Sequence, residues 1–513
     1  MFNSKLLSSS LWPGIIIFLV TLAIGLSVYQ DYGISWDEPI QRGMGSVSYN
    51  YVFQNDSSLI HFDERSHGVA FELPLILLEK KMHITDQRDL YLMRHLVTHL
   101  FFLFSCFFGY ILCLRLFKDQ FLACLGYIMF VFHPRIYTHS FFNTKDIPFL
   151  SALIILFAIT QIAFDKNKTV WYLLMAIACA YATAIRAMGI LFAAGISLFF
   201  IIDLINAILK KEKVAKTGSN FALFLAGYLV CLIAMWPILW TKPVFHFIEE
   251  FKALSHIYWH GFILLNGINY PGEELPWYYA PEWISISTPV LWVITGFAGL
   301  AWLVISFINK PVSFLSNPVQ RNFLLYAIFF TIPVFMVIAL KSILYDDWRH
   351  LYFVYPSFVL LGLFALSQFK NGVGRKIVIA LSLLQVAVLA IFMVRNHPFE
   401  NVYFNELVSH KTEHLRKSFD MDYWGCADKQ GIEYILAHDP ADTVKIWWSL
   451  DPVGNNRMMI PTKIKERVKL VDSAQATYFM TNWRNHPADY SFPDIYYDIR
   501  VMNSSVLRIY KIK

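Results

Sequence analysis

Long apolar runs separated by short polar segments dominate the chain. A helix needs about 20 apolar residues to cross a bilayer. By that criterion the pattern predicts about eleven transmembrane helices. They begin near Leu11, Leu90, Gln120, Phe149, Val170, Gly189, Phe221, Trp283, Phe323, Leu351 and Ile377. We therefore expect a polytopic α-helical membrane protein.

The third apolar segment is short for a full crossing, because Gln120 to Phe132 supplies only about 13 residues. It either continues through Ile136 and Tyr137 or does not cross, and every later loop depends on the answer. If all the apolar segments cross, six polar segments lie on the same side of the membrane as the amino terminus. All six are basic, as cytoplasmic segments usually are. They contain Lys5, Arg115, Lys118, Lys166, Lys168, Lys210, Lys211, Lys213, Lys216, Lys310, Arg321, Lys370, Arg375 and Lys376. This pattern predicts a cytoplasmic amino terminus and an extracytoplasmic region from about residue 395.

Two loops on the outer side are long enough to hold structure of their own. The loop 31–89 contains a half-apolar run at 69–78 that is too short to span and predicts an interfacial helix. The loop 241–282 is rich in Trp, Tyr and Pro, which suits interfacial helices at headgroup level. Two roles are open for this second loop, interfacial anchoring or a roof over a lipid-borne substrate.

The last part of the chain changes character. Residues 444–448, 468–471, 476–480 and 506–510 have strand-like patterns, and 430–437 has a helical one. We expect a transmembrane domain over 1–394 and a small soluble α/β domain over 395–513, on the extracytoplasmic side.

Composition agrees with a membrane protein and excludes several other classes. The chain is 57% hydrophobic and 16% charged, whereas soluble domains carry about 25% charged residues. The net charge of +6 comes with lysines in short loops, which argues against nucleic acid as a partner. Five of the six cysteines lie in apolar segments, and no paired-cysteine or zinc-like histidine spacing occurs.

Ionisable residues avoid the middles of the apolar segments and gather at their outer ends. Ion-coupled transporters place such groups near the bilayer midplane, so this pattern disfavours them. Directly after the first span comes Asp37-Glu38, beside Trp36. Charges at a bilayer edge are costly, and this pair is therefore a functional candidate.

Two further polar clusters lie on the same predicted side. Lys and Arg can neutralise a phosphate leaving group. Other roles are open for these residues. Asp146 can cap the helix that follows it, and the cations can extend along the helix ends to reach the interface. The acid-and-cation segment before the tenth span can be an ordinary ion-paired turn. The candidates are Arg135, His139, Asn143, Lys145 and Asp146 in the 133–148 loop, Arg186 after the fifth span, and Asp347, Arg349 and His350 before the tenth.

Taken together, the pair 37–38, the loop 133–148 and the corner 347–351 resemble a GT-C fold glycosyltransferase. The similarity is greatest to the protein O-mannosyltransferase and aminoarabinose transferase family, which uses polyprenyl-phosphate sugars. The tail segments 403–407 and 422–425 also resemble bacterial members. The resemblance implies that Asp37 takes the proton from the acceptor and that Glu38 orients acceptor or base. It also implies that Arg135, Lys145, Arg186 or Arg349 hold the donor phosphate.

The sequence thus leads us to expect a membrane glycosyltransferase. It would move a monosaccharide from a polyprenyl-phosphate carrier to an acceptor hydroxyl or phosphate on the outer face of a membrane, the inner membrane if the source is bacterial. The transfer would be inverting, and repulsion between the adjacent acids would raise the pKa of one of them. The expected partners are the lipid donor, membrane lipids and an acceptor glycan, lipid or protein. No cofactor is assigned, and a carboxylate-bound divalent cation stays open.

Two other functions remain open from the sequence. A non-enzymatic transporter or flippase for a lipid-linked glycan would share the spans and the aromatic loops. A polymerase or oligosaccharide transferase would share the chemistry and differ in the size of its product.

Overall fold

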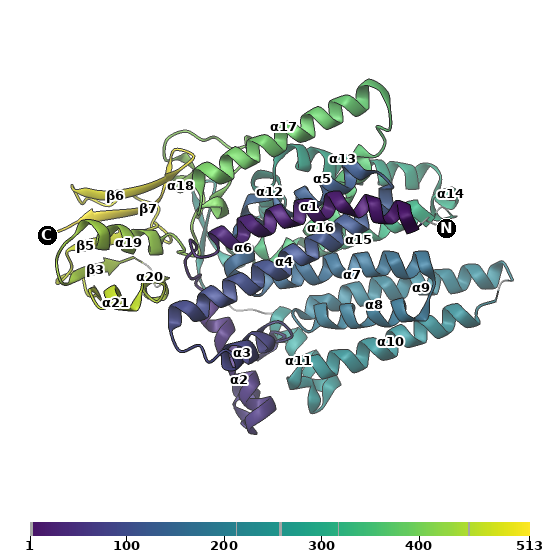
Figure 1. Ribbon diagram of the computed structural model, residues 1–513, viewed down its shortest axis with the longest axis horizontal. Helices are drawn as coiled ribbons and strands as arrows, with labels where there is room; N and C mark the ends of the chain where they lie inside the picture. Colours follow the sequence, from purple (N-terminus) through teal and green to yellow (C-terminus); the bar gives the residue numbers. More distant parts are fainter. Residues whose placement is uncertain (1–3, 212, 256–258, 317, 450–451) are drawn as a thin grey trace.

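The computed structural model describes residues 4–211, 213–255, 259–316, 318–449 and 452–513. Within them, nine helices are long and apolar enough to cross a membrane, so the chain is a multi-pass membrane protein, as predicted. Figure 1 shows these helices side by side in one elongated bundle, with the carboxy-terminal sheet at one end. They are α1 (Ser4–Val28), α4 (Gln87–Phe117), α7 (Asp146–Lys166), α9 (Ile190–Leu209), α10 (Ala215–Met235), α13 (Val290–Asn309), α15 (Pro318–Ala339), α16 (Tyr355–Leu366), which continues η6 (Arg349–Val354), and α17 (Gly372–Asn396).

The other two predicted spans are helical but irregular. α8 (Thr169–Thr183) has 15 residues, too few for a straight crossing. The third apolar segment forms α5 (Gln120–Val131) and α6 (Pro134–Phe142), which meet at an angle of 58°. The bend falls at His133-Pro134, where proline lacks the N–H that a continuous helix would need.

Ion pairs and hydrogen bonds at the two ends show that α5 and α6 together run the length of the bundle. At the start of α5, Asp119 pairs with Arg375 at the start of α17, 2.6 Å apart. In the middle of α6, Thr138 Oγ1 donates to Glu400, just beyond the end of α17, over 3.0 Å. The bent pair therefore connects the same two ends as the 25-residue helix α17.

The loop 31–89 contains two α-helices, one of which packs against the amino-terminal part of α4. α3 (Glu72–Lys81) occupies the predicted interfacial run, whereas α2 (Glu38–Gln54) was not predicted. Arg94 of α4 is fully buried and pairs with Glu72 at 2.5 Å and Glu79 at 3.0 Å. Removing either partner would leave charge buried, so this contact holds α3 in place.

The aromatic loop contains a helix, a hairpin and a second short helix, apart from residues 256–258, which lie outside the described residues. Strands β1 and β2 pair antiparallel. The elements are η4 (Pro237–Trp240), α11 (Pro243–Ser255), β1 (Phe262–Leu265), β2 (Ile268–Pro271), η5 (Gly272–Glu274) and α12 (Tyr279–Ser287). The remaining short helices outside the tail are η1 (Ser57–His61), η2 (Asp63–Ser66), η3 (Ala187–Gly189) and α14 (Pro311–Ser316).

The tail forms a small α/β unit around a five-stranded sheet of order β4-β3-β5-β7-β6. β3 is parallel to β4 and β5, and β7 is antiparallel to β5 and β6. The strands are β3 (Val444–Trp448), β4 (Val468–Leu470), β5 (Tyr478–Thr481), β6 (Ile495–Val501) and β7 (Ser504–Lys511), with η7 (Glu400–Val402), α18 (His414–Ser418), α19 (Asp428–His438), α20 (Pro452–Arg457) and α21 (Thr462–Lys465). The four predicted strands and the predicted helix are confirmed. The edge strand β6 was missed, and two register irregularities interrupt its pairing with β7.

Candidate active site

One arginine lies close to three carboxylates at the end of the bundle where α1 ends and α7 begins. Arg349, the first residue of η6, lies with Nη1 3.4 Å from Asp37 and 3.4 Å from Asp146. Its Nη2 lies 3.3 Å from Asp346. These acids come from the start of the first outer loop, the first turn of α7 and the turn before η6. The fold thus brings together three segments that are far apart in sequence.

Two aromatic rings contact the Arg349 guanidinium, one from the turn before η6 and one from the tail. Its Cζ lies 4.8 Å from the ring centroid of Tyr345 and 4.7 Å from that of Trp424, within the range of a cation–π contact. The side chain is 2% exposed, and its Nε–H has no acceptor among the described residues. A fixed, buried cation with a donor to spare suits an anionic ligand.

The loop before α7 orients Asp146 toward the arginines. Asn143 Nδ2 donates to Asp146 over 2.9 Å, while its Oδ1 accepts the backbone N–H of Asp146 over 2.8 Å. Arg186 closes the arrangement with a direct ion pair to Asp146. Asn143 supplies the side-chain acceptor for the first N–H of α7, and Asp146 is left to face Arg186 and Arg349.

Lys145 adds a second cation beside Asp37. Its Nζ lies 2.7 Å from His67 Nε2, and Glu64 lies 3.2 Å from the same nitrogen. Burial, followed by repulsion from Arg186, lowers the pKa of Lys145 to about 7, against the attraction of Asp37. The ammonium therefore titrates near neutral pH, and a bound anion would favour its charged form.

Asp37 is the most open acid of this cluster. Its side chain is 27% exposed, against 2% for Asp146 and 11% for Asp346. Burial raises the pKa of Asp37, whereas Arg349 and Lys145 oppose the increase. Asp37 precedes α2 without capping it through its side chain, and its Oδ2 lies 3.4 Å from Arg349.

Glu38 points elsewhere, which changes the predicted cause of that shift. Its side chain is 1% exposed, accepts the backbone N–H of Ser35 over 2.9 Å and lies 3.1 Å from His95 Nε2. Repulsion between the adjacent acids was expected to raise one pKa, but the pKa of Asp37 is raised by burial and by Asp346 and Asp146. Glu38 instead fixes the turn that presents Asp37.

A second arginine centre lies beside the first and is closed. Arg135 pairs with Asp347 over 3.2 Å, with both side chains fully buried, and donates to the carbonyl of Tyr403 over 2.9 Å. Its guanidinium lies 5.1 Å from the ring of Trp283 and 4.7 Å from that of Phe404.

Asp347 is held through one of its oxygens by the same buried network: Oδ2 receives every donor, and Oδ1 has no partner among the described residues. Oδ2 accepts hydrogen bonds from Tyr352 over 2.9 Å and from Tyr423 over 2.6 Å, and burial raises the pKa of Asp347 to about 6. The Tyr423 hydroxyl also lies 3.3 Å from His139 Nε2. Arg135, His139 and Asp347 therefore belong to a buried network that lies beside the Arg349 cluster.

The predicted residues divide accordingly. His350 lies against Tyr345 next to Arg349, with ring centroids 4.6 Å apart. The structure brings Asp37, Lys145, Asp146, Arg186 and Arg349 into one cluster, places Asn143 behind Asp146, and puts Arg135, His139 and Asp347 in the adjacent network.

Sequence reasoning missed four contributors to the cluster. His67 had no distinguishing neighbours, and Asp346 was passed over in favour of Asp347. Arg484 comes from the tail, and its Nη1 lies 2.5 Å from Asp346 of the membrane domain. Trp424 belonged to a noted tail segment, but the pattern gave no reason to place it on Arg349.

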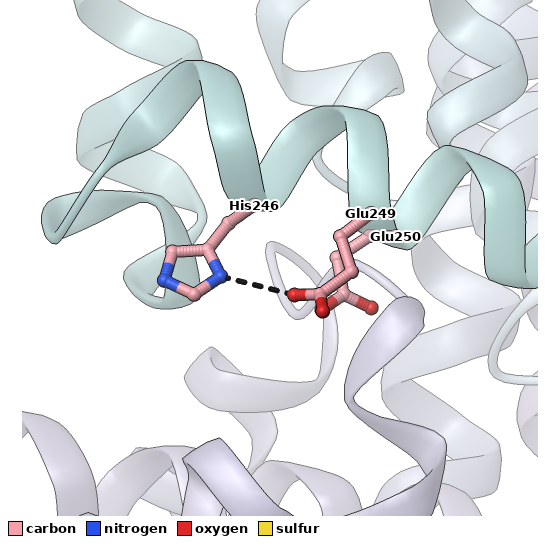
Figure 2. A group of neighbouring side chains, drawn as sticks. All are labelled: His246, Glu249 and Glu250. Carbon is pink, nitrogen blue, oxygen red and sulfur yellow. Dashed lines mark ion pairs between the residues drawn. The ribbon is translucent and has the colours of Figure 1, made fainter.

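One group of three metal-donor residues occurs in the described part of the chain. Figure 2 shows His246, Glu249 and Glu250, which project from α11. Their donor atoms lie within 4.8 Å of one another. Arg65 already lies 3.1 Å from Glu250 and 3.8 Å from Glu249. Its guanidinium balances the carboxylates, so the group connects the two outer loops and we assign no metal to it.

Comparison with known proteins gives matches in structure only. No family model matches the chain, and no curated protein sequence does. The chain resembles ArnT from Cupriavidus metallidurans in the apo state, with 11% identity, a TM-score of 0.49, and 96% of this chain and 97% of that chain covered. ArnT bound to undecaprenyl phosphate gives 10% identity and a TM-score of 0.44 over the same shares.

A third structure is the oligosaccharyltransferase AglB from Archaeoglobus fulgidus, in complex with an inhibitory peptide and a dolichol-phosphate. It shares 10% identity and a TM-score of 0.43, covering 81% of this chain and 61% of that chain. ArnT is an aminoarabinose transferase, and both proteins are GT-C fold enzymes, the class that the sequence resemblance named. At such identities the similarity concerns the fold alone.

Proposed function

We propose that this protein is a membrane glycosyltransferase that takes a monosaccharide from a polyprenyl-phosphate carrier. The observation that carries the proposal is the position of Asp37. It is a partly exposed carboxylate held 3.4 Å from the buried Arg349 guanidinium, among further cations, at one end of a membrane bundle. A base and an anion-binding group thus lie within reach of one substrate.

The cations define the donor side. Arg349, Arg186 and Lys145 surround Asp37 and Asp146, and the Nε–H groups of both arginines lack acceptors among the described residues. A phosphate at the headgroup level would receive these donors while its polyprenyl tail stays in the lipid. The same cations would neutralise the charge that develops on the leaving phosphate.

Asp37 defines the acceptor side. It would accept the proton of an acceptor hydroxyl as that oxygen attacks the anomeric carbon. The new carbon–oxygen bond forms while the bond from the anomeric carbon to the phosphate oxygen breaks, and polyprenyl phosphate leaves with inversion. A pKa of Asp37 raised by burial brings the carboxylate closer to the range in which a general base is effective. An acceptor phosphate would use the same position without the proton transfer.

Charge at the other end of the bundle supports an orientation. Arg115, Arg375 and the loop lysines lie at the end opposite to Asp37, and by the positive-inside rule this distribution supports a site on the outer face. For a bacterial source this is the periplasmic face of the inner membrane, with the tail unit on the same side.

The decisive experiment separates transfer from transport. Purified full-length protein in nanodiscs would be given undecaprenyl-phosphate monosaccharides, and released undecaprenyl phosphate would be measured by mass spectrometry. Envelope lipids and glycoproteins, compared with and without the gene, would identify the sugar and acceptor. A flippase would move labelled lipid between leaflets and leave it intact.

Asp37→Asn should reduce transfer by about 10²–10⁴-fold, the usual contribution of a general base. Asp89→Asn is the matched control, because Asp89 is 67% exposed in the first turn of α4. Transfer by Asp37→Asn at the wild-type rate would refute the role of Asp37.

A further inference from the structure

A single arginine from the tail reaches the charged cluster of the membrane domain. Arg484 Nη1 lies 2.5 Å from Asp346 Oδ1 and donates to the carbonyl of Tyr423 over 3.1 Å. The other oxygen of Asp346 lies 3.3 Å from Arg349, which faces Asp37. Arg484, Asp346, Arg349 and Asp37 thus form a chain of alternating charges from the tail to the proposed base.

The loop that carries Arg484 is strained and held from several sides. Trp483 has φ of 60° and Asn485 has φ of 63°, and such left-handed backbone is uncommon for a bulky residue such as Trp. The loop hydrogen-bonds to itself, because the N–H of Trp483 donates to Thr481 Oγ1 over 3.0 Å and that of Arg484 donates to Asn482 Oδ1 over 3.2 Å. Strain of this kind persists when surrounding structure imposes it, and it is common at functional sites.

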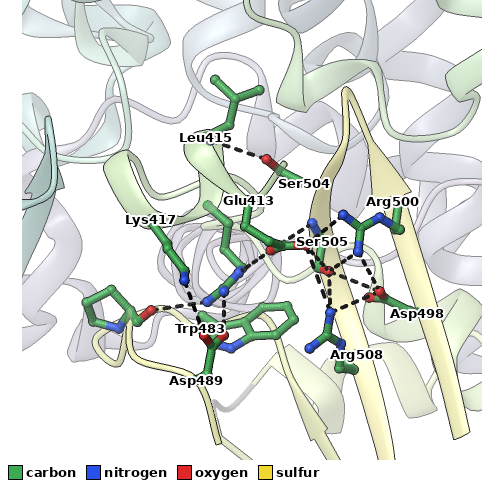
Figure 3. Close-up of polar contacts among 12 residues, drawn as sticks. Glu413, Leu415, Lys417, Trp483, Asp489, Asp498, Arg500, Ser504, Ser505 and Arg508 are labelled. Atoms are coloured by element: carbon green, nitrogen blue, oxygen red, sulfur yellow. Dashed lines mark hydrogen bonds and ion pairs between the residues drawn. The ribbon is translucent and has the colours of Figure 1, made fainter. Parts of the chain in front are cut away.

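A charged network supplies that surrounding structure. The Trp483 ring is 3% exposed and lies 4.4 Å from the guanidinium of Arg416 and 5.1 Å from that of Arg508. Figure 3 shows Trp483 among these groups, with Glu413, Asp489 and Asp498 beside it. Arg416 pairs with Glu413 and Asp489, both at 2.5 Å, and Arg508 pairs with Asp498 at 3.0 Å.

The ion pairs of the cluster indicate that Arg484 balances the charge of Asp346. Ion pairs connect three carboxylates with three guanidinium groups, and Lys145 adds a further cation beside them. They are Asp37, Asp146 and Asp346, with Arg186, Arg349 and Arg484. Arg484 also interacts electrostatically with Asp420. Without Arg484, Arg349 is the one cation left in ion-pair contact with Asp346 among the described residues.

We infer that Arg484 is a positioning residue for anion binding by the membrane domain. It shares the charge of Asp346 with Arg349 and thereby leaves more of the positive charge of Arg349 for the donor phosphate. This inference rests on the proposed function, since it assumes that Arg349 binds a phosphate. It makes the tail a part of the site.

The test is binding of undecaprenyl phosphate to the full-length protein in detergent, measured by titration calorimetry. Arg484→Gln should weaken binding about tenfold, within the usual range of coupling between neighbouring charges. Arg484→Lys, which keeps the charge, should remain within about threefold of wild type. Arg457→Gln is the matched control, because Arg457 lies in the same unit and pairs with Glu466. Melting temperatures of all variants would show that they are folded.

A double-mutant cycle tests the route through Asp346. In an Asp346→Asn background, Arg484→Gln should cause no further loss, because the charge that Arg484 balances is gone. An undiminished tenfold loss in that background would mean that Arg484 contacts the phosphate itself and would overturn the inference.

The failure of this inference differs from failure of the proposed function. Normal binding by Arg484→Gln, with binding abolished by Arg349→Gln, would overturn the inference alone. No binding of undecaprenyl phosphate to wild-type protein would overturn both.

Discussion

Two arginine centres lie side by side at one end of the helix bundle, and they differ in how their charge is balanced. Arg135 has one carboxylate, one carbonyl and two rings around it, and both members of its ion pair are fully buried. Arg349 faces three carboxylates, of which Asp37 is 27% exposed. The first arrangement is closed and stabilising, and the second has an open side on which a substrate can lie.

Two consecutive residues separate the centres. Asp346 and Asp347 have φ of 59° and 58°, and this left-handed turn sends one carboxylate to Arg349 and the next to Arg135. Aspartate tolerates this backbone conformation better than most residues. Adjacent identical side chains therefore have different surroundings, and the comparison predicts different consequences of changing each.

The largest effect should come from opening the closed centre. Asp347→Ala leaves the Arg135 guanidinium buried without its counter-charge, which should lower the free energy of unfolding by about 3–5 kcal/mol. Asp346→Ala should cost less, because Asp346 is 11% exposed. Unfolding of both variants in detergent by denaturant or heat measures the difference, and equal losses would contradict the distinction between the centres.

Removing the cation of the open centre should act on binding. Arg349→Gln loses charge-assisted hydrogen bonds worth about 1.5–3 kcal/mol, or about 10–150-fold in affinity for undecaprenyl phosphate. Arg375→Gln is a suitable control, because that arginine pairs with Asp119 at the opposite end of the bundle. Unaltered affinity in Arg349→Gln would remove this residue from the phosphate site.

The pH dependence of binding sharpens the role of Lys145. With its pKa lowered to about 7, the ammonium is charged at lower pH and loses its proton as the pH rises. Affinity for undecaprenyl phosphate should therefore fall, by up to about tenfold between pH 7 and 9, where the phosphate (second pKa about 6) is already a dianion. Lys145→Gln should bind more weakly at pH 7 and show a flatter profile. A steep profile in that variant would assign the titration to another group.

The smallest effect should come from Asn143, which orients Asp146 without facing the open side. Asn143→Ala removes the hydrogen bonds that orient Asp146, which should weaken the free energy of binding by about 1 kcal/mol. Affinity for undecaprenyl phosphate should therefore fall about fivefold. Asn371→Ala, at an exposed residue before α17, should leave affinity unchanged. A loss as large as that of Arg349→Gln would mean that Asn143 contacts the ligand.

Sequence reasoning selected most of the residues that the structure brings together but could not assign their partners. It selected Asp37, Lys145, Asp146, Arg186 and Arg349, because charges at the ends of apolar segments are costly and stand out. It grouped Arg135 and Asp347 with them, because composition does not reveal that the two neutralise each other. It chose Asp347 over Asp346 for the same reason.

The hydrophobic pattern by itself determined the membrane spans, their number to within one or two, and the strands of the tail. Those features follow from local requirements: a bilayer demands a fixed length of apolar helix, and a half-buried strand demands alternation. The tertiary structure alone decided that Glu38 turns away to His95, that Trp424 and Arg484 of the tail complete a membrane site, and that one arginine is open while its neighbour is closed. Those features depend on which distant segments converge, and the strength of a charge in a protein depends on the partners and burial that convergence provides.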